Sequence, residues 1–322
     1  MDADIALGID EAGYGPILGP LVVSAVAFET PPDIADRCLW GVLAKSVSRN
    51  RSARGGKVPI LDSKKLYSRK EGIGRLERSV LAVMSAWRGS PPHLHGLLGL
   101  LCPDVLAKLR EYPWYREVDA VLPREADAGG IQIAGSAFRR DLNTQNVHVA
   151  GMWSEILPEG HYNRLVANTQ NKAVVLSGLT LRLIQRAADA HPGRSMRIYV
   201  DKQGARQRYG LLLMRAFEDR RLRVIEETPE MSAYELAGSR TTWRVRFTQS
   251  GESHHLPVAL ASLVSKYLRE LLMACFNRYW SREAPGARPT AGYYKDGLRF
   301  LEEIEPHRLR LGIERDQLVR QR

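Results

Sequence analysis

The chain has 322 residues, of which 44% are hydrophobic and 26% are charged, the balance of a soluble globular protein. No apolar run approaches the roughly 20 residues needed to span a bilayer, and residues 1–10 carry acids instead of the basic segment of a signal peptide. Cys38, Cys102 and Cys275 lack the paired spacing of a disulfide framework. We therefore expect a cytoplasmic protein with no membrane partner.

The formal net charge of the chain is +11. Because each Lys or Arg set against a phosphate releases counterions, a basic surface favours nucleic acid as the partner. A basic protein that binds nothing anionic is the alternative, and charge alone does not separate the two.

The first half of the sequence is readable up to the end of its first long helix. Its predicted elements are a strand at 5–9, a glycine-rich turn at 13–20, a strand at 21–28, a basic mobile loop at 48–58, and a helix from 63 through 69 to 87. Residues 89–170 mix Pro, Gly and short apolar pieces, so we interpret them as an insertion or accessory lobe.

The second half has clearer periodicity, because apolar residues recur at helical spacing after residue 172. Its predicted elements are a helix at 172–190, strands at 197–200, 222–226 and 243–248, a helix at 208–219, and a long helix from Pro257 to about Trp280. Strands that alternate with helices predict an α/β sheet.

Carboxylates stand at the ends of the predicted strands. Asp10 and Glu11 end the first strand, Asp201 ends the strand at 197–200, and Glu252 follows the strand at 243–248. Ionised acids beside a core are costly unless they are paired or bound to metal. Strand-end acids meet at one edge of an α/β sheet, and such an oxygen-rich cluster suits Mg²⁺ or Mn²⁺. An exposed strand end with an ordinary turn is the alternative for Asp10-Glu11.

Five segments, in the same order, resemble the motifs of the type 2 ribonuclease H family. They are GIDEAGYGPILGP at 8–20, LDSKKL at 61–66, YVD at 199–201, GES at 251–253 followed by ALASLVSK at 259–266, and AGYYKD at 291–296. The resemblance implies an RNase H-like α/β fold, with a central mixed five-stranded sheet flanked by helices and helical additions at the C-terminal end.

The resemblance also implies a site. Its catalytic, metal-binding carboxylates would be Asp10, Glu11, Asp201 and Glu252, holding two Mg²⁺ or Mn²⁺ ions during catalysis. Its substrate-binding residues would be Gly13, Tyr14 and Gly15, whose backbone would read the ribose 2′-OH, then Ser63, Lys64, Lys65, Ser262, Lys266 and Tyr293. Simple packing is the alternative for Tyr293, and a solvated position is the alternative for each lysine.

The sequence departs from the family pattern at several positions. Tyr14 replaces an arginine of the glycine loop, which puts the preference for a single ribonucleotide in doubt. Glu252 replaces the aspartate of ribonuclease HII, as in ribonuclease HIII, while Lys202 stands where glycine is common. Since the first predicted strand carries Asp10, we expect no N-terminal domain of the kind typical of HIII. His254 and His255 beside Glu252 are either proton carriers or plain loop residues.

The resemblance implies a monomeric endoribonuclease that cleaves RNA–DNA hybrids or ribonucleotide-containing DNA, with 3′-OH and 5′-phosphate products. Its catalytic domain would span 1–305, with an inserted lobe at about 89–165, and a basic C-terminal tail would span 306–322. An inactive nucleic-acid-binding paralogue and another RNase H-like nuclease are the alternatives.

Overall fold

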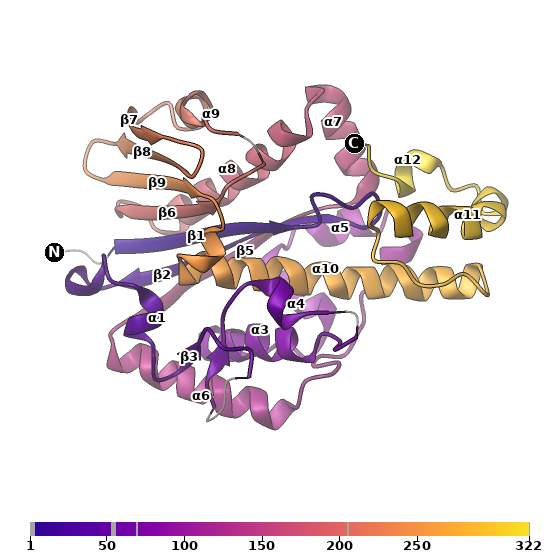
Figure 1. Ribbon diagram of the computed structural model, residues 1–322, viewed down its shortest axis with the longest axis horizontal. Helices are drawn as coiled ribbons and strands as arrows, with labels where there is room; N and C mark the ends of the chain where they lie inside the picture. Colours follow the sequence, from indigo (N-terminus) through magenta and orange to yellow (C-terminus); the bar gives the residue numbers. More distant parts are fainter. Residues whose placement is uncertain (1–3, 53–55, 69, 205, 322) are drawn as a thin grey trace.

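The computed structural model describes residues 4–52, 56–68, 70–204 and 206–321. Within these residues the centre is a seven-stranded mixed sheet of order β5-β2-β1-β6-β9-β8-β7 (Figure 1). Its strands are β1 (Asp4–Ala12), β2 (Leu21–Thr30), β5 (His148–Leu157), β6 (Met196–Asp201), β7 (Arg221–Glu227), β8 (Met231–Ala237) and β9 (Thr242–Thr248). A separate parallel pair joins β3 (Val47–Ser48) to β4 (Val58–Pro59).

Helices cover both faces of this sheet. The α-helices are α1 (Leu39–Val42), α2 (Ser63–Leu66), α3 (Gly74–Trp87), α4 (Leu94–Leu101), α5 (Val105–Leu109), α6 (Ala128–Thr144), α7 (Glu159–Thr169), α8 (Lys172–Ala190), α9 (Gly210–Ala216), α10 (Leu256–Glu283), α11 (Tyr294–Arg310) and α12 (Arg315–Leu318). Short 3₁₀ turns are η1 (Pro32–Ile34), η2 (Pro113–Tyr115) and η3 (Gly251–Ser253).

The mixed α/β sheet is confirmed, but the predicted number of five strands is wrong. The two further strands are β5, which pairs with β2, and β8, which lies between β7 and β9. β8 is built from Met, Ala, Glu and Leu as much as from β-formers, so its local preference favours a helix. Pairing on both sides overrides that preference.

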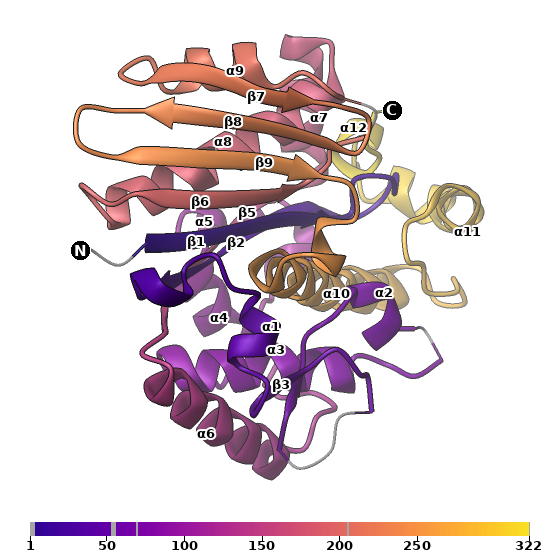
Figure 2. The same cartoon turned by 60° about the vertical axis from the view of Figure 1, so that its left-hand side comes forward.

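Alternation along β1 divides its side chains between two cores. Ile5, Leu7 and Ile9 join the core that includes α8. The other face of β1 lies against α10, which Figure 2 shows between the sheet and the layer of α3 and α6. Gly8 permits this contact, because a Cβ there would lie 2.1 Å from the backbone carbonyl carbon of Pro257. The face of β1 that carries Asp10 is therefore held against α10.

The predicted helix boundaries agree with the observed ones in one place and differ in another. The helix expected over 63–87 is two helices, α2 and α3, separated by a segment in which Gly72 has a φ of 71°. The helix expected at 172–190 matches α8. The expected lobe at about 89–165 includes β5 of the central sheet, and the expected boundary at 305/306 falls inside α11.

The described helices include none that is long and apolar enough to cross a membrane.

Candidate active site

The carboxyl ends of three neighbouring parallel strands carry the candidate acids. β1 and β6 are paired in parallel as far as Ile9 and Val200, so Asp10 and Asp201 both follow directly on a paired residue. β6 pairs in parallel with β9, and β9 runs into η3, which carries Glu252. The sheet thus brings together acids that are up to 242 positions apart in the sequence (252 − 10).

These acids repel one another in a partly buried setting. Burial and then the charges of Glu11 and Asp201 raise the pKa of Asp10, which is 7% exposed. Burial and then Asp201 raise the pKa of Glu11 to about 8, against a smaller opposing effect of Lys64. Burial and Glu252 raise the pKa of Asp201 to about 6. In each case desolvation is the largest cause of the raised pKa. The negative charge of a neighbouring carboxylate is the next largest cause that raises it.

Backbone and hydroxyl groups fix the positions of these acids. The N–H of Gly251 donates to Asp201 Oδ1 at 2.7 Å, and the N–H of Glu11 donates to Asp10 Oδ1 at 2.7 Å. Ser265 Oγ on α10 donates to the backbone carbonyl of Asp10 at 2.9 Å. Ser265 was missed by the sequence interpretation, although it lies between the predicted Ser262 and Lys266.

The donor set fits hard divalent cations. Four carboxylates offer only oxygen atoms, which suit Mg²⁺ or Mn²⁺, and a bound cation would offset the repulsion that raises their pKa values. Among the described residues, no group of three or more His, Cys, Asp and Glu side chains is already arranged to hold a metal ion. The acids are therefore gathered in one place, but they do not yet form a coordination shell.

Helix α2 brings the predicted DSKKL segment beside the acids. Asp62 caps this helix by accepting from the N–H of Lys64 at 2.9 Å. Buried Ser63 lies 3.2 Å, Oγ to Oγ, from Ser262 on α10, and Ser262 hydrogen-bonds Asp10. Lys64 lines a hollow of about 430 Å³ together with Asp201 and Glu252. Lys202 lines the same hollow, but its Nζ donates to the backbone carbonyls of Thr228 and Pro229, both at 2.7 Å, so Lys64 is the better placed of the two to meet a phosphate at the acids.

A second, larger hollow continues from the same lysine. It measures about 1100 Å³, and the basic residues that line it are Arg49, Arg51, Lys64, Lys65 and Lys70, against the acid Glu71. The guanidinium of Arg49 lies 3.9 Å from the centre of the Trp40 ring, which restricts its position. The lining that the structure describes therefore carries a surplus of positive charge. We call this hollow the basic hollow.

A third hollow, of about 690 Å³, gives a useful contrast. Its charged lining is Lys108, Arg164, Arg182 and Arg186, with the acids Asp104 and Glu155. Arg186 pairs with Asp104 at 3.0 Å, and Arg182 pairs with Glu155 at 3.4 Å. Arg164 pairs with Glu111 at 3.6 Å, so all three arginines are held in ion pairs, and we call this hollow the compensated hollow.

The predicted glycine loop lies between β1 and β2. Gly13 has a φ of 90°, and a Cβ there would lie 2.6 Å from the carbonyl oxygen of Pro20 and 2.6 Å from Arg269 Nε, so glycine is required. The half-buried ring of Tyr14 has Lys172 Nζ at 5.2 Å from its centre. Gly15 is exposed, with open space where a Cβ would be.

The turn that carries Tyr293 is docked on this glycine loop. The carbonyl of Gly292 accepts from the N–H groups of Ile17 at 2.8 Å and Leu18 at 3.2 Å. Tyr293 itself is 55% exposed, so its ring is open to a ligand.

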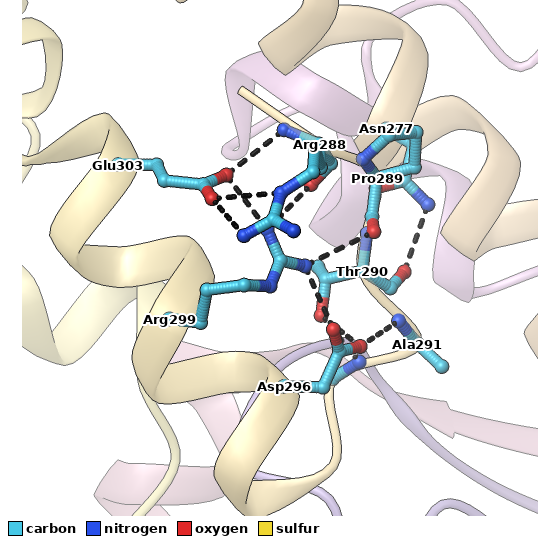
Figure 3. Close-up of polar contacts among 9 residues, drawn as sticks. Asn277, Arg288, Pro289, Thr290, Ala291, Asp296, Arg299 and Glu303 are labelled. Carbon is cyan, nitrogen blue, oxygen red and sulfur yellow. Dashed lines mark hydrogen bonds and ion pairs between the residues drawn. The ribbon is translucent and has the colours of Figure 1, made fainter. Parts of the chain in front are cut away.

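Figure 3 shows the network that holds this turn from the side of α11. Asp296 accepts from Thr290 Oγ1 and from the N–H of Ala291, both at 2.8 Å. Thr290 exchanges two backbone-to-side-chain bonds of 2.9 Å with Asn277, and Arg299 links Asp296 to Glu303. The position of the turn is therefore set by α10 and α11 together.

Two candidate residues, Lys266 and His255, make their contacts with residues other than the four acids. Lys266 donates to Glu270 at 2.7 Å and lies 4.5 Å from the centre of the Tyr67 ring, and no hydrogen bond or ion pair in the described chain joins it to the four acids. The ring of His255 stacks on Tyr199 with centres 3.9 Å apart, and burial lowers its pKa to about 4. His255 is therefore neutral at pH 7.

No protein-family model and no curated protein matches this chain. Similar solved structures include the PCNA–RNase HII complex from Archaeoglobus fulgidus, at 14% identity and a TM-score of 0.44, over 99% of this chain and 94% of that one. Another is Bst-RNase HIII with Mn²⁺, at 17% identity and 0.43, over 94% and 63%. A third is ribonuclease H2 from Pyrococcus horikoshii OT3, at 12% and 0.41, over 98% and 92%. These neighbours are type 2 ribonucleases H, and the roles of residues in this chain rest on its own geometry.

Proposed function

We propose that this chain is a metal-dependent endoribonuclease that hydrolyses the RNA strand of RNA–DNA hybrids. The observation that carries the proposal is the meeting of Asp10, Glu11, Asp201 and Glu252 beside Lys64 and the glycine loop. A protein that only bound nucleic acid would gain nothing from four acids near phosphates, because they repel the ligand.

The four carboxylates would hold Mg²⁺ or Mn²⁺. Two such ions supply the activation of a water molecule and the stabilisation of the leaving oxygen in phosphodiester hydrolysis. Hydrolysis adds water across the phosphorus–O3′ bond, so one product ends in a 3′-OH and the other in a 5′-phosphate. Lys64 would hold a phosphate at the reacting position, and Lys65 with the rest of the basic hollow would hold the backbone beyond it.

The choice of RNA over DNA is assigned to the backbone of Gly13, Tyr14 and Gly15. A 2′-OH is the group that distinguishes the two strands, and a backbone without bulky side chains at positions 13 and 15 can approach it closely. Exposed Tyr293, docked against the same loop through Gly292, would stack on the sugar or base beside the cleaved bond.

Cleavage of a labelled RNA–DNA hybrid by the purified chain tests this proposal. We expect cleavage with Mn²⁺ or Mg²⁺, and a loss of about a thousandfold or more in Asp10→Asn and Asp201→Asn, because each removes a charge from the metal-binding set. Asp33→Asn, which changes an exposed acid on η1, is the matched control and should keep full activity. No cleavage with either metal by the unsubstituted chain would overturn the proposal.

The same preparation decides the substrate preference within this class. A DNA duplex that contains one ribonucleotide presents the 2′-OH at a single position, next to DNA on both sides. Efficient incision of this duplex would mean that Tyr14, in place of an arginine, does not prevent recognition of the junction. Cleavage confined to longer RNA tracts would assign the chain to that narrower substrate class.

A further inference from the structure

Arg320 is buried beneath the glycine loop, far from the charged surface where arginines usually lie. Its side chain is 3% exposed. Its Nη2 donates to the backbone carbonyls of Gly13 and Pro16, and its own N–H donates to the carbonyl of Ile17 at 2.8 Å. All three acceptors belong to the loop between β1 and β2.

The burial of this guanidinium is energetically unfavourable. Its Nε and Nη1 have no hydrogen-bond partner in the part of the chain that the structure describes, and a buried polar group without partners is costly. The ring of Tyr162, with its centre 4.9 Å from the guanidinium carbon, offsets part of that cost. An apolar side chain would fill the same buried site at a lower free-energy cost. This points to a role for Arg320 in setting the geometry of the loop.

Helix α7 binds both the loop and the segment that carries Arg320. Asn163 Nδ2 donates to the carbonyls of Asp316 at 2.6 Å and Val319 at 2.7 Å, and Asn163 Oδ1 accepts from the N–H of Gln321 at 2.8 Å. One turn earlier, buried Glu159 accepts from the N–H of Gly19 at 3.1 Å. Figure 1 shows α12 beside α7.

Fixing a carbonyl also fixes the N–H that follows it. The peptide bond is planar and trans, so the N–H of Tyr14 points away from the carbonyl of Gly13. Arg320 holds that carbonyl, and no acceptor in the described chain is bonded to the Tyr14 N–H. This donor is therefore oriented and available.

We propose that Arg320, held by Asn163, is a positioning residue that aims the Tyr14 N–H at the ribose 2′-OH of the substrate. This inference rests on the proposed ribonuclease function. It gives the 311–321 segment and helix α7 a role in recognising RNA, although neither belongs to the five segments at 8–20, 61–66, 199–201, 251–266 and 291–296.

Two substitutions test this inference from different sides. Arg320→Ala removes the side-chain contacts with the loop, while Asn163→Ala releases the segment without touching the loop. We expect each to lower kcat/KM on the hybrid by about tenfold or more, since small misplacements of positioned groups carry penalties of this size. Arg320→Lys keeps one cationic donor and should restore part of the activity. Arg315→Ala, which removes an exposed charge from the same segment, is the control.

Two readouts separate positioning from simple loss of stability. Without metal, the ratio of Kd for a DNA duplex to Kd for a hybrid of the same sequence should fall toward one in Arg320→Ala and Asn163→Ala. Hydrogen–deuterium exchange over residues 13–19 should become faster well below the melting temperature, while exchange in β6 stays unchanged. Mn²⁺ affinity, measured by calorimetry, should be retained.

The outcomes distinguish this inference from the function beneath it. If the unsubstituted chain cleaves hybrids and Arg320→Ala matches it in kcat/KM, in the Kd ratio and in loop exchange, the inference is wrong and the function stands. If the unsubstituted chain neither cleaves nor prefers hybrids, the function fails, and with it the assigned role of the Tyr14 N–H. In that case, unchanged hydrogen–deuterium exchange of the loop in Arg320→Ala would show in addition that Arg320 does not position the loop.

Discussion

At the scale of single residues, burial decides the charge of the candidate catalytic acids. Asp10, Glu11 and Asp201 would be ionised at neutral pH in water. Their pKa values are raised here because desolvation and the neighbouring acids both oppose ionisation. The metal-free site is therefore under electrostatic strain at pH 7 and above.

This strain predicts a pH dependence of stability in EDTA. A group whose folded pKa is raised above its unfolded value stabilises the fold while it is protonated, and that contribution is lost as the pH rises through the folded pKa. For Glu11, with a folded pKa of about 8, and Asp201, with one of about 6, the loss falls between roughly pH 4 and pH 8. The free energy of unfolding should therefore fall across this window.

Chemical denaturation of the unsubstituted chain and of Asp201→Asn measures this effect. The lowered pKa values of His161, His191 and His255 act with the opposite sign in an overlapping window, so the informative quantity is the difference between the two proteins. Asp201→Asn should gain stability relative to the unsubstituted chain as the pH rises from about 5 to about 8. A difference that stays constant with pH would contradict the prediction.

At the scale of elements, the contact between β1 and α10 sets the site. Gly8→Ala should destabilise the fold by about 1–3 kcal/mol, the usual penalty for overpacking, because its Cβ would meet the backbone of Pro257. Gly178→Ala is the control, since it adds a methyl group to α8 with nothing within 4 Å, and it should be neutral or slightly stabilising. Urea unfolding measures both. Equal midpoints would mean that α10 can move away from β1 freely.

Elements with strong local patterns could be predicted from the sequence. The apolar run of β1 ends at two acids. The helical period of α8 begins after Asn171, whose side chain caps the helix, and ends at the His191-Pro192-Gly193 break. β5 could not be found this way, because it contains Gly151 and a mixture of polar and apolar residues without regular alternation. Its strand conformation comes from pairing with β2, and that information is not local.

The candidate site divides in the same way. Its four acids and its glycine loop stand in dense motifs that are visible along the chain. Ser265, Glu159 and Arg320 act through hydrogen bonds with the backbone of the site. Their roles depend on which helices pack together, so residue type and spacing did not single them out, even for Ser265, which lies within the quoted segment at 259–266.

At the scale of the whole molecule, the distribution of charge matters more than its total. The surplus of positive charge lies in the basic hollow beside Lys64, whereas the compensated hollow holds its arginines in ion pairs. A nucleic-acid backbone should therefore bind at the basic hollow and bind weakly, if at all, at the compensated hollow.

Salt-dependent binding in EDTA tests this distribution. The double substitution Arg49→Ala with Lys65→Ala should weaken hybrid binding and reduce the slope of log K against log salt by about 0.9 for each phosphate that the protein no longer neutralises. The matched pair Arg164→Ala with Arg182→Ala removes two charges from the compensated hollow and should leave the slope unchanged. Equal slopes in both double variants would assign binding to another surface.

The hydrogen bond of Arg320 with Gly13 joins residues 307 positions apart. Proteins are synthesised from the N-terminus at about 5–20 residues per second, so a nascent chain exposes its first loop for about 15–60 s before residue 320 has been added. During that interval the strand-end acid Asp10 and the loop beside it are already made, but the loop lacks its buried guanidinium. Each newly made molecule therefore completes this loop only after residue 320 has been synthesised and has reached it.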